Sequence, residues 1–240
     1  MSLAGAMESA PVSQEMVVSE MPSRRHCLYL DDFSGSEISA VLDSAKGMAE
    51  VLGRYIKKYE QVAMATNNRI HLYEALVKSV ISQQLSGKAA HSILSKLKNQ
   101  VGGKKPISPE KILDTPFGKI RGAGVSESKA RTIVTLAKMT ETGAIPSARK
   151  MKGMSDGEII GILTSVKGIG RWTVEMILMF KLGRKDVMPV TDLGVRKGYS
   201  IIFGCKELGA PKTILDHSHK WSPYRSYVAK YFWAAADDKL

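Results

Sequence analysis

The stretch from Leu163 to Phe180 reads Leu-Thr-Ser-Val-Lys-Gly-Ile-Gly-Arg-Trp-Thr-Val-Glu-Met-Ile-Leu-Met-Phe. Its spacing predicts two helices joined by a short hairpin, with Gly168 and Gly170 at the turn. Amides at a helix N-terminus lack partners within the helix and carry partial positive charge, and glycine lets an anion approach the backbone closely. The hairpin is therefore a candidate site for a phosphate group.

An ordinary glycine-rich turn is the alternative interpretation of this hairpin. A dinucleotide-binding loop is excluded, because no strand precedes the hairpin and Thr173 stands where that motif needs a third glycine. The cations Lys167 and Arg171 beside the glycines favour the phosphate interpretation, since phosphate contacts use such side chains together with backbone amides. The residues expected to contact a DNA backbone are Val166, Lys167, Gly168, Ile169, Gly170, Arg171 and Thr173.

The overall composition is that of a globular protein with a basic excess. The 240 residues are 44% hydrophobic and 24% charged, and their net charge is +12. A basic excess favours a polyanionic partner such as nucleic acid, although many soluble proteins are basic for solubility alone. No secretory signal and no apolar run of the ~20 residues needed to cross a bilayer is present, so a soluble intracellular protein without membrane contact is expected.

Helical periodicity runs through most of the chain, whereas strand signals are almost absent. The expected fold class is all-α, with about nine or ten short helices in two lobes and an active-site cleft between them. Residues 1–34 are expected to form a mobile N-terminal tail. One helical lobe would combine 35–66, including a helix over 36–59, with 188–240. The central lobe would span 67–187 and end with the helix-hairpin-helix.

Polar residues that can cap helices mark several helix starts in the central lobe. Ser108 followed by Pro109 predicts a capped short helix, Ser126 predicts a capped helix that runs to Met139, and Ser155-x-x-Glu158 is a capping box. Further helices are expected over 72–81, 89–97, 192–203, 211–216 and 222–236.

Asp192 lies 22 residues beyond the second glycine of the hairpin, in Met-Pro-Val-Thr-Asp-Leu-Gly-Val-Arg-Lys-Gly. An Asp in this position is most often a helix N-cap. That role does not exclude a chemical one, because the helix dipole favours the ionised carboxylate. A carboxylate in a partly dry cleft can stabilise an oxocarbenium-like sugar or activate a water, as cleavage of an N-glycosidic bond requires. Asp192 is therefore the candidate catalytic residue.

Four sequence blocks together resemble the alkylbase branch of the helix-hairpin-helix DNA glycosylases, the 3-methyladenine DNA glycosylase II family. They span roughly residues 70–235 in the order of that family. The blocks are Leu76-Val-Lys-Ser-Val-Ile-Ser-Gln-Gln-Leu-Ser86, Gly168-Ile-Gly-Arg-Trp-Thr, Asp186-Val-Met-Pro-x-x-Asp192-Leu-Gly-Val-Arg-Lys-Gly and Trp221-Ser-Pro-Tyr-Arg-Ser-Tyr-x-x-x-Tyr-x-Trp233.

The resemblance implies a monofunctional DNA glycosylase. Such an enzyme flips an alkylated purine, for example 3-methyladenine or 7-methylguanine, out of duplex DNA and hydrolyses its N-glycosidic bond, which starts base excision repair. The implied partner is double-stranded DNA that contains a damaged base. A monomer without a cofactor or a metal is expected, in the nucleus of a eukaryote or otherwise in the cytoplasm and nucleoid.

The resemblance also implies roles for individual residues. Asp192 matches the catalytic aspartate of the family. The matching base-pocket positions are Gln83, Trp172, Met176 and Trp233, and the wedge that fills the vacated stack would be Gln84 or Leu85. Core packing is the alternative for the two tryptophans, whereas in a base pocket their electron-rich rings would face a cationic alkylated base. Thr191 and Met176 depart from the family pattern, since some members carry a second Asp and a Tyr there.

Lyase chemistry and a metal site are not expected. Trp172 stands where the endonuclease III branch places its nucleophilic Lys, and the four-cysteine cluster of that branch is absent from this sequence, which contains only Cys27 and Cys205. Whether these two cysteines pair stays open. His217 and His219 with Cys205 lack the spacing of a zinc site. The alternatives to a monofunctional glycosylase are a non-catalytic DNA-binding module and a bifunctional glycosylase/lyase.

Overall fold

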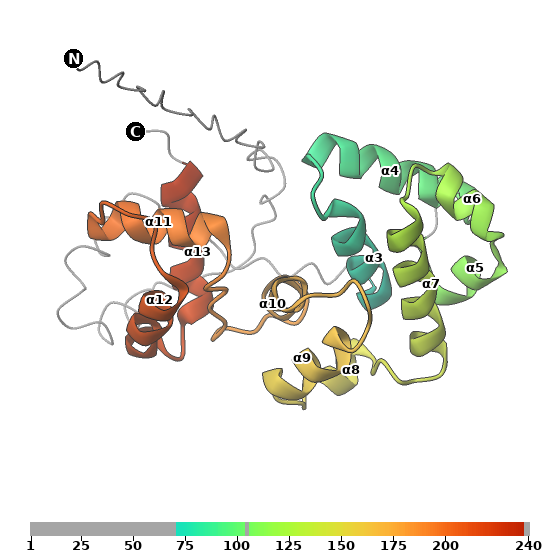
Figure 1. Cartoon of the computed structure of the whole chain (residues 1–240). Coiled ribbons are helices and arrows are strands. Elements are labelled where there is room, and N and C mark those ends of the chain that lie inside the picture. The colour runs from blue at the N-terminus through green and yellow to red at the C-terminus, as the bar shows by residue number, and fades with distance from the viewer. Residues whose placement is uncertain (1–70, 104–105, 238–240) are drawn as a thin grey trace, which may run out of the picture.

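The computed structural model describes residues 71–103 and 106–237, and all regular structure in these ranges is helical (Figure 1). The predicted all-α class is confirmed. The described ranges already contain eleven α-helices and one 3-10 helix, more than expected. The short helices α6 (Phe117–Gly122) and α8 (Ala148–Met151) were missed because each is too short to show a repeating apolar pattern. The predicted tail over 1–34 and the segment 35–66, with its helix, lie outside the described residues.

The remaining elements follow one another through short connections. They are α3 (Leu72–Ser82), α4 (Gly87–Gln100), α5 (Pro109–Asp114), α7 (Glu127–Glu141), α9 (Asp156–Thr164), α10 (Arg171–Phe180), α11 (Leu193–Phe203), α12 (Pro211–Ser218), η2 (His219–Trp221) and α13 (Arg225–Asp237). No helix among the described residues is both long enough and apolar enough to cross a membrane.

The predicted caps are confirmed at two of the three positions. The Ser126 hydroxyl accepts a hydrogen bond from the backbone of Lys129, and Ser155 forms a capping box with Glu158. The prediction for Ser108 is wrong. Its hydroxyl donates to the carboxylate of Glu110 at 3.0 Å and does not cap α5. The Ser108 hydroxyl is thus directed as a donor toward a charged acceptor, and no backbone amide of α5 donates to it.

Two groups of helices lie on either side of α10 (Figure 1). On one side α3 packs against α4 and α7, and α5 packs against α7; on the other side α11 packs along α13. Helix α10 contacts α9 and α3. The sequence predicts an apolar stripe on α3 that begins at Leu72, which is half-buried, and its other members are buried in the core: Leu76, Val77, Val80 and Ile81. Since part of the expected outer lobe lies outside the described residues, the division at 187/188 stays a prediction.

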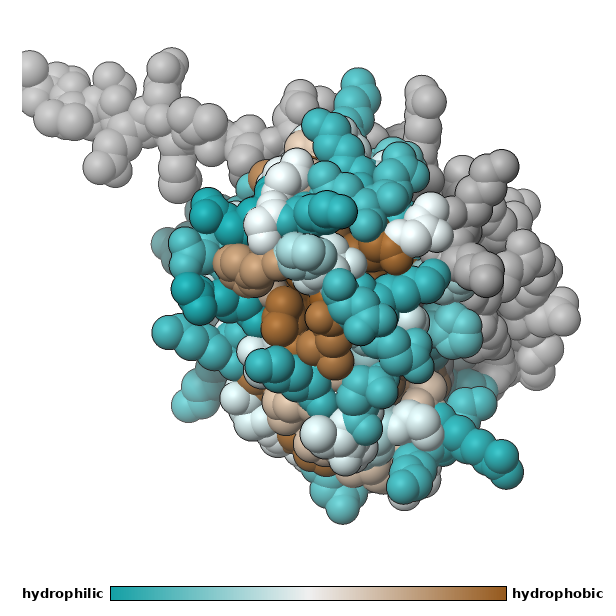
Figure 2. Space-filling view, turned by 90° about the vertical axis from the view of Figure 1, so that its right-hand side faces the viewer, coloured by the Kyte–Doolittle hydropathy of each residue, from teal (hydrophilic) through white to brown (hydrophobic). Residues whose placement is uncertain are grey.

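The surface nearest α5 and α6 is mostly hydrophilic, with a small apolar area at its centre (Figure 2). The exposed large apolar side chains of these two helices are Leu113 and Phe117. The guanidinium of Arg131 on α7 lies 5.6 Å from the centre of the Phe117 ring. Charged side chains thus surround the apolar area and keep this surface compatible with solvent.

Helices α11 and α13 approach each other closely at Gly198. A Cβ atom at this position would collide with the backbone carbonyl of Phe232 on α13. The ring of Phe232 is fully buried and lies edge-on to Trp221, with 5.5 Å between the ring centres. Gly198 therefore allows the backbones to pack in direct contact. This contact fixes the N-terminal end of α11, where Asp192 lies, relative to α13.

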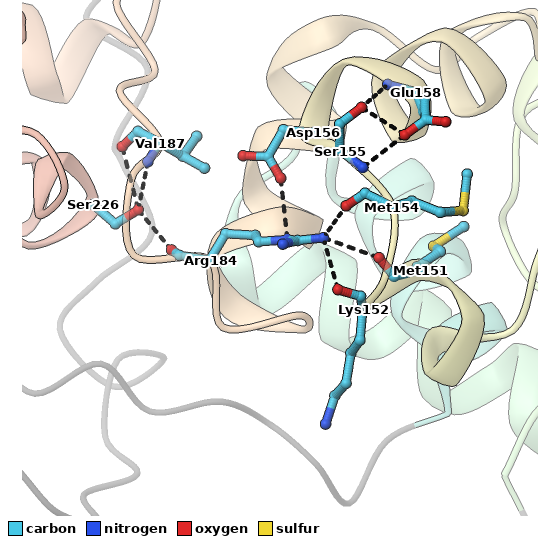
Figure 3. Close-up of polar contacts among 9 residues, drawn as sticks. All are labelled: Met151, Lys152, Met154, Ser155, Asp156, Glu158, Arg184, Val187 and Ser226. Atoms are coloured by element: carbon cyan, nitrogen blue, oxygen red, sulfur yellow. Dashed lines mark hydrogen bonds and ion pairs between the residues drawn. The ribbon is translucent and has the colours of Figure 1, made fainter.

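Arg184 connects the segment after α10 to two other parts of the chain (Figure 3). Its Nη2 donates to the backbone carbonyls of Met151, at 2.9 Å, and Met154, and its Nε forms an ion pair with Asp156 at 3.1 Å. Its own carbonyl accepts a hydrogen bond of 2.7 Å from the hydroxyl of Ser226 on α13. The segment between α10 and α11 is thus fixed to the turn between α8 and α9 and to the start of α13.

Replacing Arg184 with methionine is expected to lower the free energy of unfolding by about 2 kcal/mol, because backbone carbonyls lose a charged donor. Arg184→Lys should recover only part of this loss, since an ammonium lacks the planar fork of the guanidinium. Urea unfolding measures both variants. Lys152→Met removes an exposed cation from the same region and serves as the control. Equal unfolding free energies for Arg184→Met and Lys152→Met would contradict the prediction.

Candidate active site

Three N–H donors hold the carboxylate of Asp192. Asp192 is the N-cap of α11, and its Oδ1 accepts a bond of 2.9 Å from the backbone of Val195, which confirms the predicted cap. The same oxygen accepts a hydrogen bond of 2.6 Å from the indole Nε1 of Trp233. The other oxygen, Oδ2, accepts a hydrogen bond of 2.7 Å from the indole Nε1 of Trp172. Both carboxylate oxygens are therefore held in a fixed direction.

These residues come from three helices. Trp172 lies in the first turn of α10, Asp192 begins α11 and Trp233 lies on α13. The Trp172 side chain is 42% exposed, while Asp192 is half-buried. The carboxylate therefore lies beside an accessible indole rather than in a closed core. Sequence reasoning placed both tryptophans near Asp192 but missed that their N–H groups point at it, because no linear pattern encodes the direction of an indole N–H.

Gly194 permits the close approach of Trp233 to Asp192. A Cβ atom at Gly194 would lie 2.6 Å from Cδ1 of the Trp233 ring and 3.1 Å from Oδ1 of Asp192. Real contacts are not this short, so any side chain here would displace the indole or the carboxylate. Sequence reasoning missed this role. The available signal was a glycine in the first turn of an expected helix, where the conformation itself does not require one.

A second carboxyl group lies near Asp192. Glu175 on α10 is buried, and its Oε1 accepts a bond of 3.0 Å from Nε of Arg171, whereas its buried Oε2 has no hydrogen-bond partner. Burial raises the pKa of Glu175; the hydrogen bond and the charge of Arg171 oppose this shift, while the negative charge of Asp192 adds to it. The Arg171 side chain remains 68% exposed. Glu175 therefore orients Arg171 without removing it from the surface.

The hairpin before α10 exposes its glycines and hides its apolar residues. Gly168 has a φ of +96°, and a Cβ there would collide with the hydroxyl of Thr132. That hydroxyl donates to the carbonyl of Lys167 at 2.9 Å. Gly170 is the N-cap of α10 and supplies no side chain to its first-turn amides. These amides are therefore available to an anion that approaches the exposed backbone.

Three residues of the set expected to contact a DNA backbone have buried side chains, so any contact that they make with DNA is limited to their main chain, and their role stays a prediction. The side chains of Val166, Ile169 and Thr173 are buried, with exposed fractions of 2%, 4% and 2%. Val166 and Ile169 anchor the hairpin in the core, and the amide of Ile169 closes the turn by donating to the carbonyl of Val166 at 3.0 Å. Apolar side chains on the inner face of a tight turn have no route to the surface. The exposed members of the set are Lys167, Gly168, Gly170 and Arg171.

Helix α3 is followed directly by Gln83, Gln84 and Leu85, and Gln83 connects this segment to the hairpin. Nε2 of Gln83 donates to the carbonyl of Gly168 at 3.0 Å and to the hydroxyl of Thr173 at 3.4 Å. Gln84 is exposed with a φ of +57°, and Leu85 is 38% exposed. Gln83 thus links the two segments, so its base-pocket role stays a prediction. The exposed pair Gln84 and Leu85 is available to act as a wedge.

The remaining candidates take different places. Met176 is half-buried on α10, one helical turn after Trp172 and on the same face. His217 shares a hydrogen bond of 2.6 Å with the hydroxyl of Tyr199, and Cys205 is exposed. Within 71–103 and 106–237, no three His, Cys, Asp or Glu side chains meet at metal-binding spacing.

The chain is similar in sequence and structure to DNA repair proteins. The model of the HhH-GPD superfamily of base excision DNA repair proteins matches residues 77–223. DNA-3-methyladenine glycosylase 1 of Schizosaccharomyces pombe is 39% identical over 161 residues, which cover 67% of this chain and 71% of that protein.

Two solved structures share the fold. The 3-methyladenine DNA glycosylase of Schizosaccharomyces pombe in complex with abasic DNA has a TM-score of 0.71 and 34% identity, covering 81% of this chain and 95% of that one. The DNA-3-methyladenine glycosidase of Bacillus halodurans has a TM-score of 0.75 and 32% identity, covering 82% of this chain and 89% of that one. With its hairpin, its Asp192 site and these relatives, the chain belongs to the HhH-GPD superfamily of base excision DNA repair proteins.

Proposed function

We propose that this protein is a monofunctional DNA glycosylase that removes alkylated purines such as 3-methyladenine and 7-methylguanine from double-stranded DNA. The observation that carries the proposal is the carboxylate of Asp192, held by two indole N–H groups and a backbone amide beside an accessible ring. The relatives named as 3-methyladenine glycosylases support the class of substrate. The protein acts as a monomer in the compartment that holds the genome, the nucleus in a eukaryote.

The hairpin holds the DNA backbone near the lesion. Exposed Gly168 and Gly170 allow a phosphate to approach the first-turn amides of α10. Lys167 and Arg171 add positive charge on the same surface. Such contacts fix the position of the protein on the duplex without reading its sequence. They therefore suit an enzyme that has to act at damaged bases in any sequence.

The damaged nucleotide has to leave the stack before the reaction can occur, because C1′ of a stacked nucleotide is not reachable. Gln84 and Leu85, exposed beside the hairpin, fill the space that the flipped base leaves. The N–H edges of Trp172 and Trp233 are already engaged by Asp192. The exposed ring of Trp172 therefore keeps a face for the cationic purine, as a cation–π contact requires, whereas the ring centre of Trp233 lies 5.8 Å from that of Phe180.

The reaction then breaks the bond between C1′ and the base nitrogen. An alkylated purine carries a positive charge, so it leaves with the bonding electron pair as a neutral base and needs no strong general acid. The ionised carboxylate of Asp192 stabilises the positive charge that develops on the sugar. A water molecule adds to C1′ and loses a proton to solvent, which leaves an abasic site.

The direct test is to incubate the protein with methylated duplex DNA and to measure free 3-methyladenine and 7-methylguanine by chromatography. Release of these bases without strand cleavage is expected. Tight binding without release of any alkylated base would favour the non-catalytic DNA-binding alternative. A covalent DNA adduct trapped by borohydride would instead reveal a glycosylase/lyase.

Gly168→Ala is expected to weaken binding to undamaged duplex DNA about tenfold and to lower the free energy of unfolding by about 2 kcal/mol. The backbone at position 168 has a positive φ that alanine rarely adopts, and the new methyl group would displace the side chain of Thr132. Gly118→Ala is the control, because Gly118 is an exposed glycine on α6, away from the hairpin, and no atom lies within 4 Å of the new Cβ. Fluorescence anisotropy with a labelled duplex and thermal unfolding measure the two effects. The prediction fails if both variants bind DNA equally well.

A further inference from the structure

We infer that Lys129 is a positioning residue that sets the wedge turn, defined as Ser82 to Leu85, and couples it to the hairpin. The inference rests on the proposed function, since it assigns to this turn the task of opening the base stack. The hydrogen bonds of the Lys129 ammonium go to carbonyls of Ile81 and Gln83, and not to the candidate catalytic carboxylate or the hairpin. It acts through the backbone carbonyls of the turn.

The wedge turn has a conformation that its residues do not favour. The amide of Leu85 donates to the carbonyl of Ser82 at 3.2 Å. Gln83 has φ −54° and ψ 127°, and Gln84 has a φ of +57°. These angles describe a type II turn, whose third position prefers glycine or asparagine. A glutamine there costs about 1 kcal/mol, so the turn has to be held by its surroundings.

Lys129 on α7 stabilises this turn conformation. Its Nζ donates to the carbonyl of Ile81 at 2.9 Å and to the carbonyl of Gln83 at 2.6 Å. Both carbonyls belong to the end of α3, where the helix leaves acceptors without partners and carries partial negative charge. One ammonium therefore ties the last turn of α3 to the central peptide of the wedge turn, between Gln83 and Gln84. Burial of this amine lowers the pKa of Lys129, because desolvation disfavours its charged form.

The same face of α7 also holds the hairpin. Thr132, three residues after Lys129, donates through its hydroxyl to the carbonyl of Lys167 at 2.9 Å. Gln83 completes the connection, because its side chain donates to the carbonyl of Gly168. Residues three apart on a helix lie on one face. Helix α7 thus fixes the wedge turn and the phosphate-binding hairpin relative to each other, and Lys129 is its contact with the wedge turn.

This arrangement separates opening of the base stack from binding of the backbone. Without the ammonium, water can reach the two carbonyls, since Lys129 is only half-buried. The fold should persist while the wedge turn leaves its left-handed conformation. We expect Lys129→Met to slow base release by about 10- to 100-fold, the effect of losing hydrogen bonds from a charged donor. Binding to undamaged duplex, which depends on the exposed hairpin, should change little.

The experiment compares the full-length wild type with Lys129→Met, Lys129→Arg and Lys138→Met. Lys138 is an exposed lysine on the same helix, so its variant loses the same charge without touching the turn. Four quantities are measured: the melting temperature, the single-turnover rate of base release from methylated duplex, the affinity for undamaged duplex, and the fluorescence of 2-aminopurine placed opposite a tetrahydrofuran abasic analogue. The last quantity reports insertion of the wedge without requiring catalysis.

Lys129→Met should reduce both base release and the 2-aminopurine signal, Lys129→Arg should restore part of each, and Lys138→Met should leave both unchanged. Equal behaviour of Lys129→Met and Lys138→Met would overturn the inference. A parallel loss of undamaged-duplex affinity, wedge signal and melting temperature would also overturn it, because Lys129 would then serve stability alone. If the wild type released no base, the proposed function would fail, whereas the fluorescence comparison would still decide the role of Lys129.

Discussion

Asp192→Asn is expected to lower the single-turnover rate of base release by about 100- to 1000-fold, the typical cost of removing a fixed electrostatic group from the site of a developing charge. The substitution removes the negative charge and nearly preserves the shape of the side chain. Asparagine is also a good N-cap, so α11 should keep its start. Chromatography of bases released from methylated duplex measures the rate.

The hydrogen bonds around Asp192 predict how the asparagine side chain of the variant is oriented. The single oxygen of an asparagine can accept from the amide of Val195 and from Trp233, as Oδ1 of Asp192 does. The new NH₂ group then faces Trp172, whose exposed ring can turn toward water. The fold and the affinity for a tetrahydrofuran-containing duplex should therefore be retained within about threefold. Undiminished base release by Asp192→Asn would remove the carboxylate from its proposed role.

Gly198→Ala is expected to have the largest effect on stability. The added methyl group has to displace the backbone of Phe232 on α13, and a backbone cannot rotate away as a side chain can. We expect a loss of about 3 kcal/mol in the free energy of unfolding, or roughly 6–12 °C in melting temperature for a protein of this size. Thermal unfolding followed by circular dichroism measures the shift. Base release should fall as well, because the same contact positions Asp192 against Trp233.

Gly161→Ala provides the matched control for this variant. Gly161 is an exposed glycine inside α9, and no atom lies within 4 Å of its new Cβ. In open space the better helix propensity of alanine should raise the unfolding free energy by about 0.5–1 kcal/mol. Both variants add one methyl group to a helical glycine, at Gly198 against the backbone of a neighbouring helix and at Gly161 into open space. If Gly198→Ala were as stable as Gly161→Ala, close packing of α11 on α13 would not be required.

Much of the fold followed from local signals in the sequence. The capping box at Ser155, the cap at Ser126 and the apolar stripe of α3 each depend on residues within one or two helical turns, and all three are present. The N-cap role of Asp192 belongs to the same class. Short helices such as α8 escaped prediction, because four residues cannot show a helical period.

Contacts between distant residues could be predicted only in part. The resemblance brought Trp172, Asp192 and Trp233 to one site, but not the direction of their N–H groups. The ion pair of Arg171 with Glu175 fits the four-residue spacing of the two side chains, but that spacing alone does not show whether Arg171 pairs with Glu175 or faces solvent. The role of Lys129 could not be predicted from the sequence. Its partners are backbone carbonyls, which leave no trace in the side-chain pattern.

The segment between α10 and α11 is fixed at several points along its length. Arg184 fastens it to the turn before α9, Asp186 pairs with Arg225 at 2.6 Å, and the amide of Val187 donates to the hydroxyl of Ser226. The spatial separation of hairpin and carboxylate is therefore determined by these cross-connections and not by how many amino acids intervene. We therefore expect the site to tolerate a change in the number of residues between the two motifs, provided that Arg184, Asp186 and Ser226 are retained.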